Sequence, residues 1–377
     1  MTFAIRNRQI VVTFENPLAS RLFPSPDTGL FPADYAEARQ RWLTALSSID
    51  ASLRSYPCAG SGPNGEVLAT DAVWIGAHDA QSVVVLLAGT HGVEGFVGSA
   101  VQLDVLQALI GKRLAETTAL LLVHSLTPWG FAWLRRCGGD GVDLNRNAVD
   151  FSAPLPINPH YDALRPELFD TDATRRRQAF AEFERQFGRV AFEQAVSGGQ
   201  YSDPAGPFYG GRAATHGRSV CEDLIERFSL RQRRLAIIDL HSGLGPYGYG
   251  EIICDHAPDS AGAVTARRWY GNAVTLPLAG TSSSVPKLGL LDYLWHEAMG
   301  GDSCYVTLEF GSYSTEQLFA VLLTDHQLWA QSGNEAARAA HSLAMREHFC
   351  PADPAWRVAV LARARQVIDQ ALTGVAA

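Results

Sequence analysis

Four short apolar runs stand out along the chain, and each is followed at once by polar and glycine residues. The segments are rich in leucine or β-branched residues and cover Ser82–Gly95, Thr118–Gly130, Arg234–Gly248 and Cys304–Tyr313. Apolar runs of about 4–8 residues are typical of strands buried on both faces, as in a largely parallel sheet covered by helices. The pattern therefore predicts four such strands.

Helical patterns lie between and after these strands. Val97–Ile110 has apolar residues at three- and four-residue spacing, and Thr174–Val196 is amphipathic and rich in good helix formers. From Ser314 onward the chain predicts three helices separated by the strings SGN and CPADP, whereas Asp150–Leu168, rich in Pro and Asn, predicts a long ordered loop. Strands that alternate with helices indicate an α/β sandwich.

Several polar side chains occur where the predicted strands end. His91 and Glu94 follow one strand, His241 follows a second, and Glu309 ends a third. In open α/β sheets, functional groups gather in the crevice beyond the carboxyl ends of the strands. We therefore expect these four residues to meet at one edge of the sheet.

Charge and composition exclude several classes of protein. The formal net charge of -8 makes nucleic acid an unsuitable partner, because phosphate binding needs a basic surface. No stretch reaches the roughly 18 apolar residues of a membrane span, and the N-terminus lacks the pattern of a signal peptide. The six cysteines form no C-x-x-C pair, which predicts neither a disulfide framework nor a thiolate zinc site and favours a reduced, cytoplasmic setting.

The string HGVE, from His91 to Glu94, places an imidazole and a carboxylate three residues apart where a helix begins. At this spacing both side chains lie on one face and can reach one ion. Catalytic zinc commonly takes two histidines and one glutamate, so His241 is the candidate third ligand. Asp143 and, as the weaker candidate, Asp239 could accept hydrogen bonds from the imidazoles. Each residue alone also has an ordinary structural explanation, such as a helix-terminal carboxylate.

The order and spacing of five strings resemble those of zinc carboxypeptidases, the carboxypeptidase A-like enzymes and their aspartoacylase-like relatives. GTHGVEG, which contains His91, resembles their metal-binding turn. GVDLNRN follows, with Asn145 lying 51 residues after Glu94, and Arg136 stands nine residues before Asn145. IDLHSG then presents His241, and VTLEFG presents Glu309 after a strand. The resemblance covers roughly residues 91–313 and implies a mixed, largely parallel sheet in a three-layer α/β/α sandwich.

The resemblance implies a catalytic zinc site in this chain. His91, Glu94 and His241 would hold one Zn²⁺ per chain, and Asp143 would orient His91 from outside the ligand set. The expected activity is hydrolysis of an amide bond in a small peptide or acylated amino acid that carries a carboxylate.

The resemblance also implies roles for the groups around the metal. Glu309 would act as the general base toward a zinc-bound water, and Arg136, rather than its neighbour Arg135, would stabilise the oxyanion. Asn145 and Arg146 would bind the substrate carboxylate, because the guanidinium fork matches it bidentately.

Two departures from the family pattern leave the substrate open. Thr127–Gly130 reads TPWG where carboxypeptidases commonly carry Asn-Pro-Asp-Gly. The tyrosine that closes over the substrate in carboxypeptidase A-like enzymes has no clear counterpart. Five candidates are present, none of them placed by a motif: Tyr247, Tyr249, Tyr270, Tyr293 and Tyr313.

Three other functions compete with a carboxypeptidase-like hydrolase. An N-acyl amino acid deacylase of the aspartoacylase or succinylglutamate desuccinylase type needs nearly the same machinery. A catalytically inactive binding protein is disfavoured, because all three ligands and the base are present. A serine hydrolase is disfavoured by the lack of a G-x-S-x-G string, and Ser282–Ser284 predicts a turn.

The sequence predicts a single zinc-hydrolase domain over residues 1–377. Within it, residues 1–70 are expected to form an N-terminal extension, and residues 314–377 a helical C-terminal end that packs on the domain. The oligomeric state and the preferred side chain of the substrate are not predicted by any pattern in the sequence.

Overall fold

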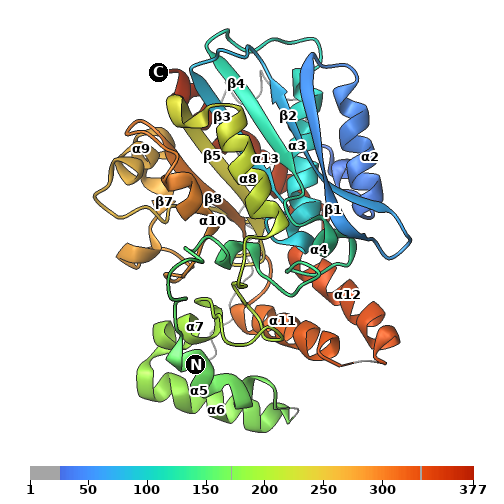
Figure 1. Ribbon diagram of the computed structural model, residues 1–377, viewed down its shortest axis with the longest axis vertical. Coiled ribbons are helices and arrows are strands. Elements are labelled where there is room, and N and C mark those ends of the chain that lie inside the picture. Colours follow the sequence, from blue (N-terminus) through green and yellow to red (C-terminus); the bar gives the residue numbers. More distant parts are fainter. Residues whose placement is uncertain (1–25, 171, 332) are drawn as a thin grey trace, which may run out of the picture.

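A single mixed sheet lies at the centre of the molecule (Figure 1). The computed structural model describes residues 26–170, 172–331 and 333–377, and within them eight strands form this sheet in the order β1-β2-β4-β3-β5-β8-β6-β7. Its centre consists of four mutually parallel strands. They are the four predicted from apolar runs: β3 (Ser82–Ala88), β4 (Thr118–His124), β5 (Arg234–Ser242) and β8 (Cys304–Phe310).

Four further strands extend the sheet at its edges. β1 (Ala51–Ser61) and β2 (Val67–Ile75) pair antiparallel, and β2 continues antiparallel onto β4. At the other edge, β6 (Gly250–Ile253) runs antiparallel to β8 and pairs with the short parallel strand β7 (Val274–Thr275). The sheet is therefore mixed but parallel at its centre, which confirms the predicted α/β fold class.

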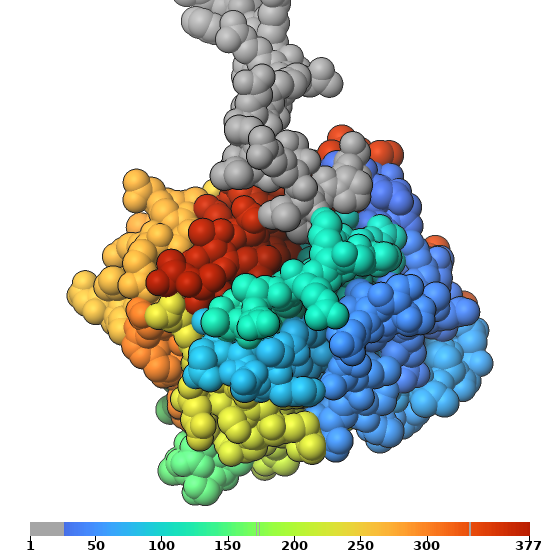
Figure 2. Space-filling view, turned by 90° about the horizontal axis from the view of Figure 1, so that it is seen from above, coloured from blue at the N-terminus to red at the C-terminus, as the bar shows by residue number. Residues whose placement is uncertain are grey.

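Helices cover both faces of the sheet and complete the three layers. One face packs against α2 (Tyr35–Leu46), α3 (Gly95–Leu109), α9 (Ala261–Tyr270) and α13 (Pro354–Ala376). The other face packs against α8 (His216–Arg227) and α10 (Leu291–His296). Side chains of a strand alternate between its two faces, so Val84 and Leu86 of β3 join the first core and Val83 and Val85 the second. Figure 2 shows α13, in red, on the outside of the first face.

A third group of helices lies below the sheet in Figure 1. It has its own apolar core and consists of α5 (Pro159–Leu168), α6 (Ala173–Phe187), α7 (Arg189–Ser197), α11 (Thr315–Trp329) and α12 (Glu335–Phe349). Short helical turns are also present, among them η1 (Thr28–Leu30), α4 (Pro128–Ala132), η4 (Leu230–Gln232), η5 (Gly271–Ala273) and η6 (Pro277–Ala279).

Two local predictions are wrong. The segment Asp150–Leu168, predicted as a loop, ends in helix α5, because the Asn158 side chain accepts a hydrogen bond from the helix and Pro159 occupies the first helical position. The single helix predicted over Thr174–Val196 is divided into α6 and α7. Gly188 adopts a φ of 86° between them, a left-handed conformation that ends a helix and suits glycine.

The two ends of the chain contribute directly to the fold. Of the predicted extension 1–70, residues 1–25 lie outside the described residues. From residue 26 on, α2 packs against α3, and β1 and the start of β2 belong to the sheet itself. The predicted helical end 314–377 forms α11, α12 and α13, separated at the predicted strings. No helix within the described residues is long and apolar enough to cross a membrane.

A buried ion pair joins α13 to α3, the helix that begins at the candidate metal-binding turn. The Arg365 Nε and Nη2 atoms lie 2.7 and 2.6 Å from the two Asp104 carboxylate oxygens. Replacing Arg365 by Met leaves a buried, uncompensated carboxylate, so we expect the free energy of unfolding to fall by about 3 kcal/mol. Urea unfolding measures the change. Adding Asp104→Leu should recover most of the loss, and a change below about 1 kcal/mol in the single variant would contradict the prediction.

Candidate metal centre and active site

The turn that carries His91 and Glu94 is fixed against a neighbouring segment of backbone. Its central residues form the turn η2 (Gly92–Glu94), and α3 begins directly after it. The N–H of Gly92 donates to the carbonyl of Arg136 over 3.0 Å. A side chain at Gly92 would collide with the backbone of Gly130, so glycine is required for this close approach. The same contact brings the segment containing Arg136 against the turn that carries His91 and Glu94.

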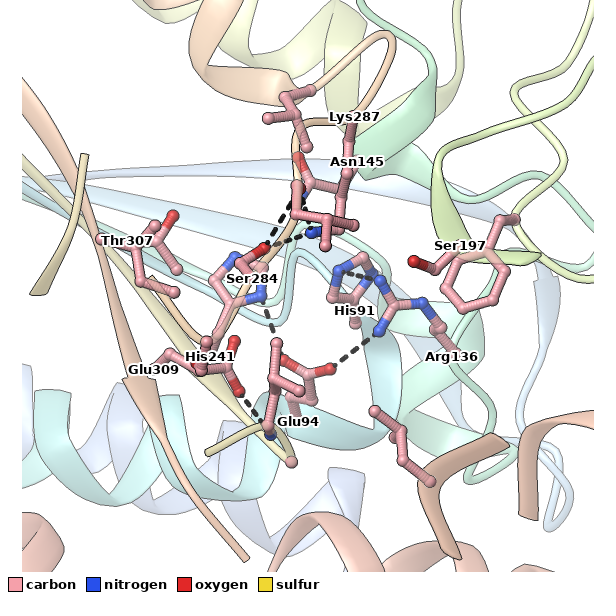
Figure 3. A pocket seen from close by; sticks show the side chains of 18 of the residues that line it. His91, Glu94, Arg136, Asn145, Ser197, His241, Ser284, Lys287, Thr307 and Glu309 are labelled. Carbon is pink, nitrogen blue, oxygen red and sulfur yellow. Dashed lines mark hydrogen bonds and ion pairs between the residues drawn. The ribbon is translucent and has the colours of Figure 1, made fainter. Parts of the chain in front are cut away.

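His241 and Glu309 lie on adjacent parallel strands. In the register of β5 and β8, His241 is directly paired with Glu309, and β3, which leads to His91, lies on the other side of β5. Neighbouring strands are separated by about 4.8 Å. The structure therefore brings together at one edge of the sheet the four residues that the sequence placed at strand ends (Figure 3).

His91, Glu94 and His241 form a buried triad whose side chains are suited to hold one metal ion. Each residue is 2 % exposed, and one ligand atom from each lies within 4.8 Å of the other two. In the described part of the chain this is the one such group of His, Cys, Asp or Glu residues. Two imidazoles and a carboxylate are a known donor set of catalytic zinc, so the residues present fit this ion.

A network of hydrogen bonds orients His241. Its Nε2 lies 2.7 Å from an oxygen of Asp239, which also accepts from Thr90 and from Tyr305, each over 2.8 Å. The His241 Nδ1 lies 3.1 Å from Glu94. Burial alone would lower the pKa of His241, but the two carboxylates outweigh burial and raise it well above its usual value. Asp239, the weaker candidate in the sequence, is thus the direct partner of this ring.

Arg136, the arginine that the sequence favoured over Arg135, faces the triad. Its Nη2 lies 2.6 Å from His91 Nε2, its Nη1 lies 3.3 Å from Glu94, and its Nε donates to Asp143 over 3.0 Å. Asp143 in turn lies 3.3 Å from His91 Nδ1. Arg135 points elsewhere and pairs with an aspartate of α11. The cation beside the triad is therefore Arg136, held by two carboxylates.

The electrostatic environment of Glu309 differs from that of an ordinary surface glutamate. Its side chain is 9 % exposed, and one oxygen accepts a hydrogen bond from the Leu244 N–H over 3.0 Å. Burial and the neighbouring Glu94 raise its pKa to about 7. Burial and Arg136 lower the pKa of His91 to about 4, so that ring is neutral near pH 7. A carboxyl group with a pKa near 7 is suited to accept and return a proton at neutral pH.

Asn145 and Arg146 lie in the turn η3 (Leu144–Arg146) and line the same pocket as the triad. Arg146 is fully buried, and its Nε and Nη2 donate to the carbonyl of Ser197, at the end of α7, over 3.2 and 2.7 Å. Its guanidinium lies over the ring of Phe208. In the described residues no carboxylate lies within 4.0 Å of it. A buried cation that contacts only carbonyls and a ring remains available to an anionic ligand.

The pocket also contains residues that the sequence did not nominate. Ser197, Phe208 and Lys287 line it, and so do Asp255 and Asp292. They come from loops, from a helix end and from the short helix α10, where no apolar periodicity or recognised string marks a site. The one available signal was the SSSVPK string, which was predicted as a turn and which carries the pocket lysine (Figure 3).

None of the five candidate tyrosines is among the described residues that line the pocket. The hydroxyls of Tyr247 and Tyr313 bond instead to carboxylates near the surface. Tyr293 donates to the main-chain carbonyl of Lys287 over 3.1 Å and so supports the loop that carries this lysine.

Fold and site together define an α/β protein with a buried His–Glu–His triad that suggests a zinc site. The chain belongs to the family described as "Protein of unknown function (DUF2817)", which matches residues 31–363. No curated protein matches the chain.

Several solved structures are similar to the chain. Thrombin activatable fibrinolysis inhibitor shares 12% identity, with 94% of this chain and 82% of that chain covered and a TM-score of 0.44. An aspartoacylase family protein from Mesorhizobium loti shares 14% identity, with 81% and 69% covered and a TM-score of 0.35. The murein-tripeptide amidase MpaA from Escherichia coli O157 shares 16% identity, with 82% and 97% covered and a TM-score of 0.33. Because these identities and TM-scores are low, the assignment of the candidate site rests on the residues described above.

Proposed function

We propose that this protein is a zinc-dependent hydrolase of the metallocarboxypeptidase type, which cleaves an amide bond in a small substrate that carries a carboxylate. One observation carries the proposal: Glu309 lies directly beside His241 in the strand register, so a carboxyl group suited to act as a base adjoins a His–Glu–His triad that fits zinc. This combination supplies both parts of a metal-assisted hydrolysis.

The zinc ligands would be His91, Glu94 and His241. A zinc ion held there would lower the pKa of a coordinated water toward about 7 and polarise the carbonyl of the scissile amide. Asp239 keeps the His241 ring in one orientation, since it is itself held by Thr90 and Tyr305.

Glu309 would transfer the proton in this reaction, and Arg136 would stabilise the negative charge. Glu309 accepts a proton from the attacking water and gives it to the nitrogen of the leaving amine as the C–N bond breaks. Arg136 donates to the carbonyl oxygen as negative charge develops there. Its guanidinium is held by Glu94 and Asp143, so it costs little reorganisation during the reaction.

Arg146 and Asn145 would anchor the substrate carboxylate. The support is electrostatic: Arg146 is a buried cation without an acidic partner within 4.0 Å among the described residues, and burial has already lowered its pKa to about 10. A carboxylate that enters the pocket would supply the missing counter-charge. Charge-assisted hydrogen bonds of this kind contribute roughly 1.5–3 kcal/mol.

Replacing Arg146 by Met should therefore raise KM by about 10- to 150-fold and change kcat much less, because the anchor contacts substrate and transition state alike. Steady-state kinetics on a carboxylate-bearing amide measure both constants. Arg113→Met, at an exposed position between α3 and β4, is the matched control. A large fall in kcat at unchanged KM would assign Arg146 to the chemical step instead.

A second candidate is an N-acyl amino acid deacylase with the same machinery. This second function is retained because helices α7 and α11 enclose part of the pocket. Residues of both helices, among them Ser197, Leu318 and Phe319, line it together with the triad. Such a cover favours small substrates, and a short peptide and an acylated amino acid both satisfy this condition.

The experiment that tests the proposal is a substrate panel on the zinc-loaded protein. Dipeptides and N-acyl amino acids with free carboxylates are incubated with it, and the released amine is quantified by mass spectrometry. Cleavage of dipeptides supports the carboxypeptidase assignment, whereas cleavage of N-acyl amino acids alone supports the deacylase. Amides whose carboxylate is methylated should be poor substrates in either case. Binding of these compounds without cleavage would identify a binding protein.

A further inference from the structure

The backbone of Phe208 is strained where this residue lines the pocket. Its φ is 57°, in the left-handed region, and no other non-glycine residue among the described ones that line the pocket has a positive φ. A bulky residue rarely adopts this conformation, because its Cβ is crowded by the backbone. Such strain persists only where the surrounding structure enforces it, and it is concentrated at functional sites. The fold therefore enforces the position of this side chain.

Hydrogen bonds of the neighbouring backbone hold Phe208 in this conformation. Its carbonyl accepts from the N–H of Gln200 over 3.1 Å, and the N–H of Gly210 donates to the carbonyl of Gln200 over 2.9 Å. Between these two bonds, the carbonyl of Tyr209 accepts from the N–H of Asp143 over 2.8 Å. Phe208 is thus fixed between the segment that follows α7 and the turn that carries Asp143.

The ring of Phe208 contacts two guanidinium groups. The Cζ atom of Arg136 lies 5.1 Å from the ring centroid, and that of Arg146 lies 5.3 Å from it. The face of an aromatic ring carries negative charge density and attracts a cation within about 6 Å of its centroid. Phe208 is 5 % exposed, and such contacts are stronger where water is excluded. Among the described residues this is the one ring over which either guanidinium lies.

The two arginines carry the same charge in one buried pocket. Arg136 is paired with Glu94 and Asp143, whereas no carboxylate lies within 4.0 Å of Arg146 in the described residues. Burial and, to a smaller extent, the charge of Arg136 lower the pKa of Arg146 to about 10. An electron-rich ring that contacts both guanidiniums offsets part of this repulsion. It also limits the orientations that each guanidinium can adopt.

The helices below the sheet position this ring. Phe208 belongs to their apolar core together with Phe192 of α7. The carbonyl of Ser197, at the end of the same helix, accepts from Arg146 over 2.7 Å. Figure 3 shows Ser197 on the side of the pocket where Arg136 lies. The helical layer therefore reaches Arg146 at two points, through a main-chain carbonyl and through the ring of Phe208.

We propose that Phe208 is a positioning residue whose ring holds Arg136 and Arg146 in their working orientations, one toward the developing oxyanion and the other toward the substrate carboxylate. The inference rests on the proposed function and adds a residue that couples its two cationic groups. A phenyl ring can neither exchange a proton nor donate a hydrogen bond. Phe208 therefore acts through the two arginines.

The first test is Phe208→Leu, which keeps an apolar side chain and removes the ring. Loss of one cation–π contact corresponds to about 2- to 30-fold. On a carboxylate-bearing amide we expect kcat to fall by such a factor through Arg136, and KM to rise by such a factor through Arg146. Phe183→Leu, in the same apolar core but without an arginine over its ring, is the matched control and should leave both constants near those of the unmodified protein.

A graded change of the ring separates charge from packing. Phenylalanines with one, two and three fluorine atoms are introduced in place of Phe208. Fluorine withdraws electron density from the ring face with little change in size. We expect kcat/KM to fall stepwise with each fluorine atom while the melting temperature stays nearly constant. This series keeps the proposal testable even if Phe208→Leu fails to fold.

Three outcomes would overturn the positioning role and leave the proposed hydrolysis intact. The first is unchanged kcat and KM in Phe208→Leu. The second is an equal loss in Phe183→Leu, which would assign the effect to the apolar core. The third is the same kcat/KM throughout the fluorinated series, because the shape of the ring would then be sufficient.

A binding measurement separates failure of this role from failure of the proposed function. Titration calorimetry with N-acetyl-leucine is carried out on proteins that also carry Glu309→Gln, so that cleavage does not interfere. We expect the affinity to fall stepwise with fluorination and by about 2- to 30-fold in Phe208→Leu. If no amide is cleaved but this gradient is found, the positioning of Arg146 stands and the hydrolysis fails. Equal affinities throughout the series, or no binding even with Phe208 in place, would refute the positioning of Arg146.

Discussion

Replacing His241 by alanine is expected to weaken zinc binding strongly and, with it, to remove most of the amide hydrolysis. The triad is the one candidate metal site in the described residues, and His241 is held in place by Asp239 and lies against Glu94. If a binding free energy of roughly 10–16 kcal/mol is shared by three or four ligands, one ligand accounts for roughly 3–4 kcal/mol. Affinity for zinc should then fall by about 10²–10³-fold. Metal content per chain, measured by mass spectrometry after dialysis, reports the loss.

Three further variants test whether the loss of zinc is specific to the triad. His91→Ala should behave like the first variant, whereas Asp239→Asn, which only weakens the support of the ring, should lower the zinc affinity by about 10–100-fold. His78→Ala, at an exposed position away from the triad, should keep the full metal content. A chelator should remove activity from the unmodified protein, and added zinc should restore it. Failure of the unmodified protein to take up zinc would remove the basis of the proposed function.

The second large effect is expected from Glu309→Gln. Glutamine keeps the volume of the side chain and an oxygen that can accept from the Leu244 N–H, but it cannot take a proton from water. Since general acid–base catalysis contributes about 10²–10⁴-fold, kcat should fall by roughly that factor. KM and metal content should change little, because Glu309 is outside the triad. Kinetics and metal analysis on the same preparation separate the two effects.

The matched control for this substitution is Glu347→Gln, an exposed glutamate that accepts a hydrogen bond from Tyr313. It should keep full activity. Unchanged kcat in the Glu309 variant would refute the base, and loss of zinc together with activity would mean that Glu309 helps to hold the metal.

The sequence predicted the centre of the fold because β3, β4 and β5 each contain an uninterrupted apolar run and β8 follows a similar pattern. It missed β2, which is interrupted by Thr70 and Asp71; both are buried, and Asp71 is neutralised by Arg39 from α2 over 2.6 Å. That compensation comes from another element and leaves no trace in the local pattern. The break at Gly188 was overlooked because the apolar spacing continues across it.

At the site, the sequence predicted the residues that follow strands but not the residues that come from loops. His91, Glu94, His241 and Glu309 could be found because a strand end fixes where a side chain goes. Asp255, Lys287 and Asp292 share the pocket only after β6, α10 and the loop between them have packed. The importance of Asp239 was underestimated because its partner is two residues away on the same strand, a spacing that puts both side chains on one face.

The order of the central strands also affects when the site can form during folding. His91 and His241 are 150 residues apart in the chain and meet because β3 and β5 are neighbours in the sheet. In small zinc modules the ligands are close in sequence, and the ion can organise an unfolded chain. Here the closure of so long a loop must come first, and it carries an entropic cost of roughly 4 kcal/mol. Metal capture would therefore be a late event in folding, and zinc uptake would report whether newly made protein has reached its native topology.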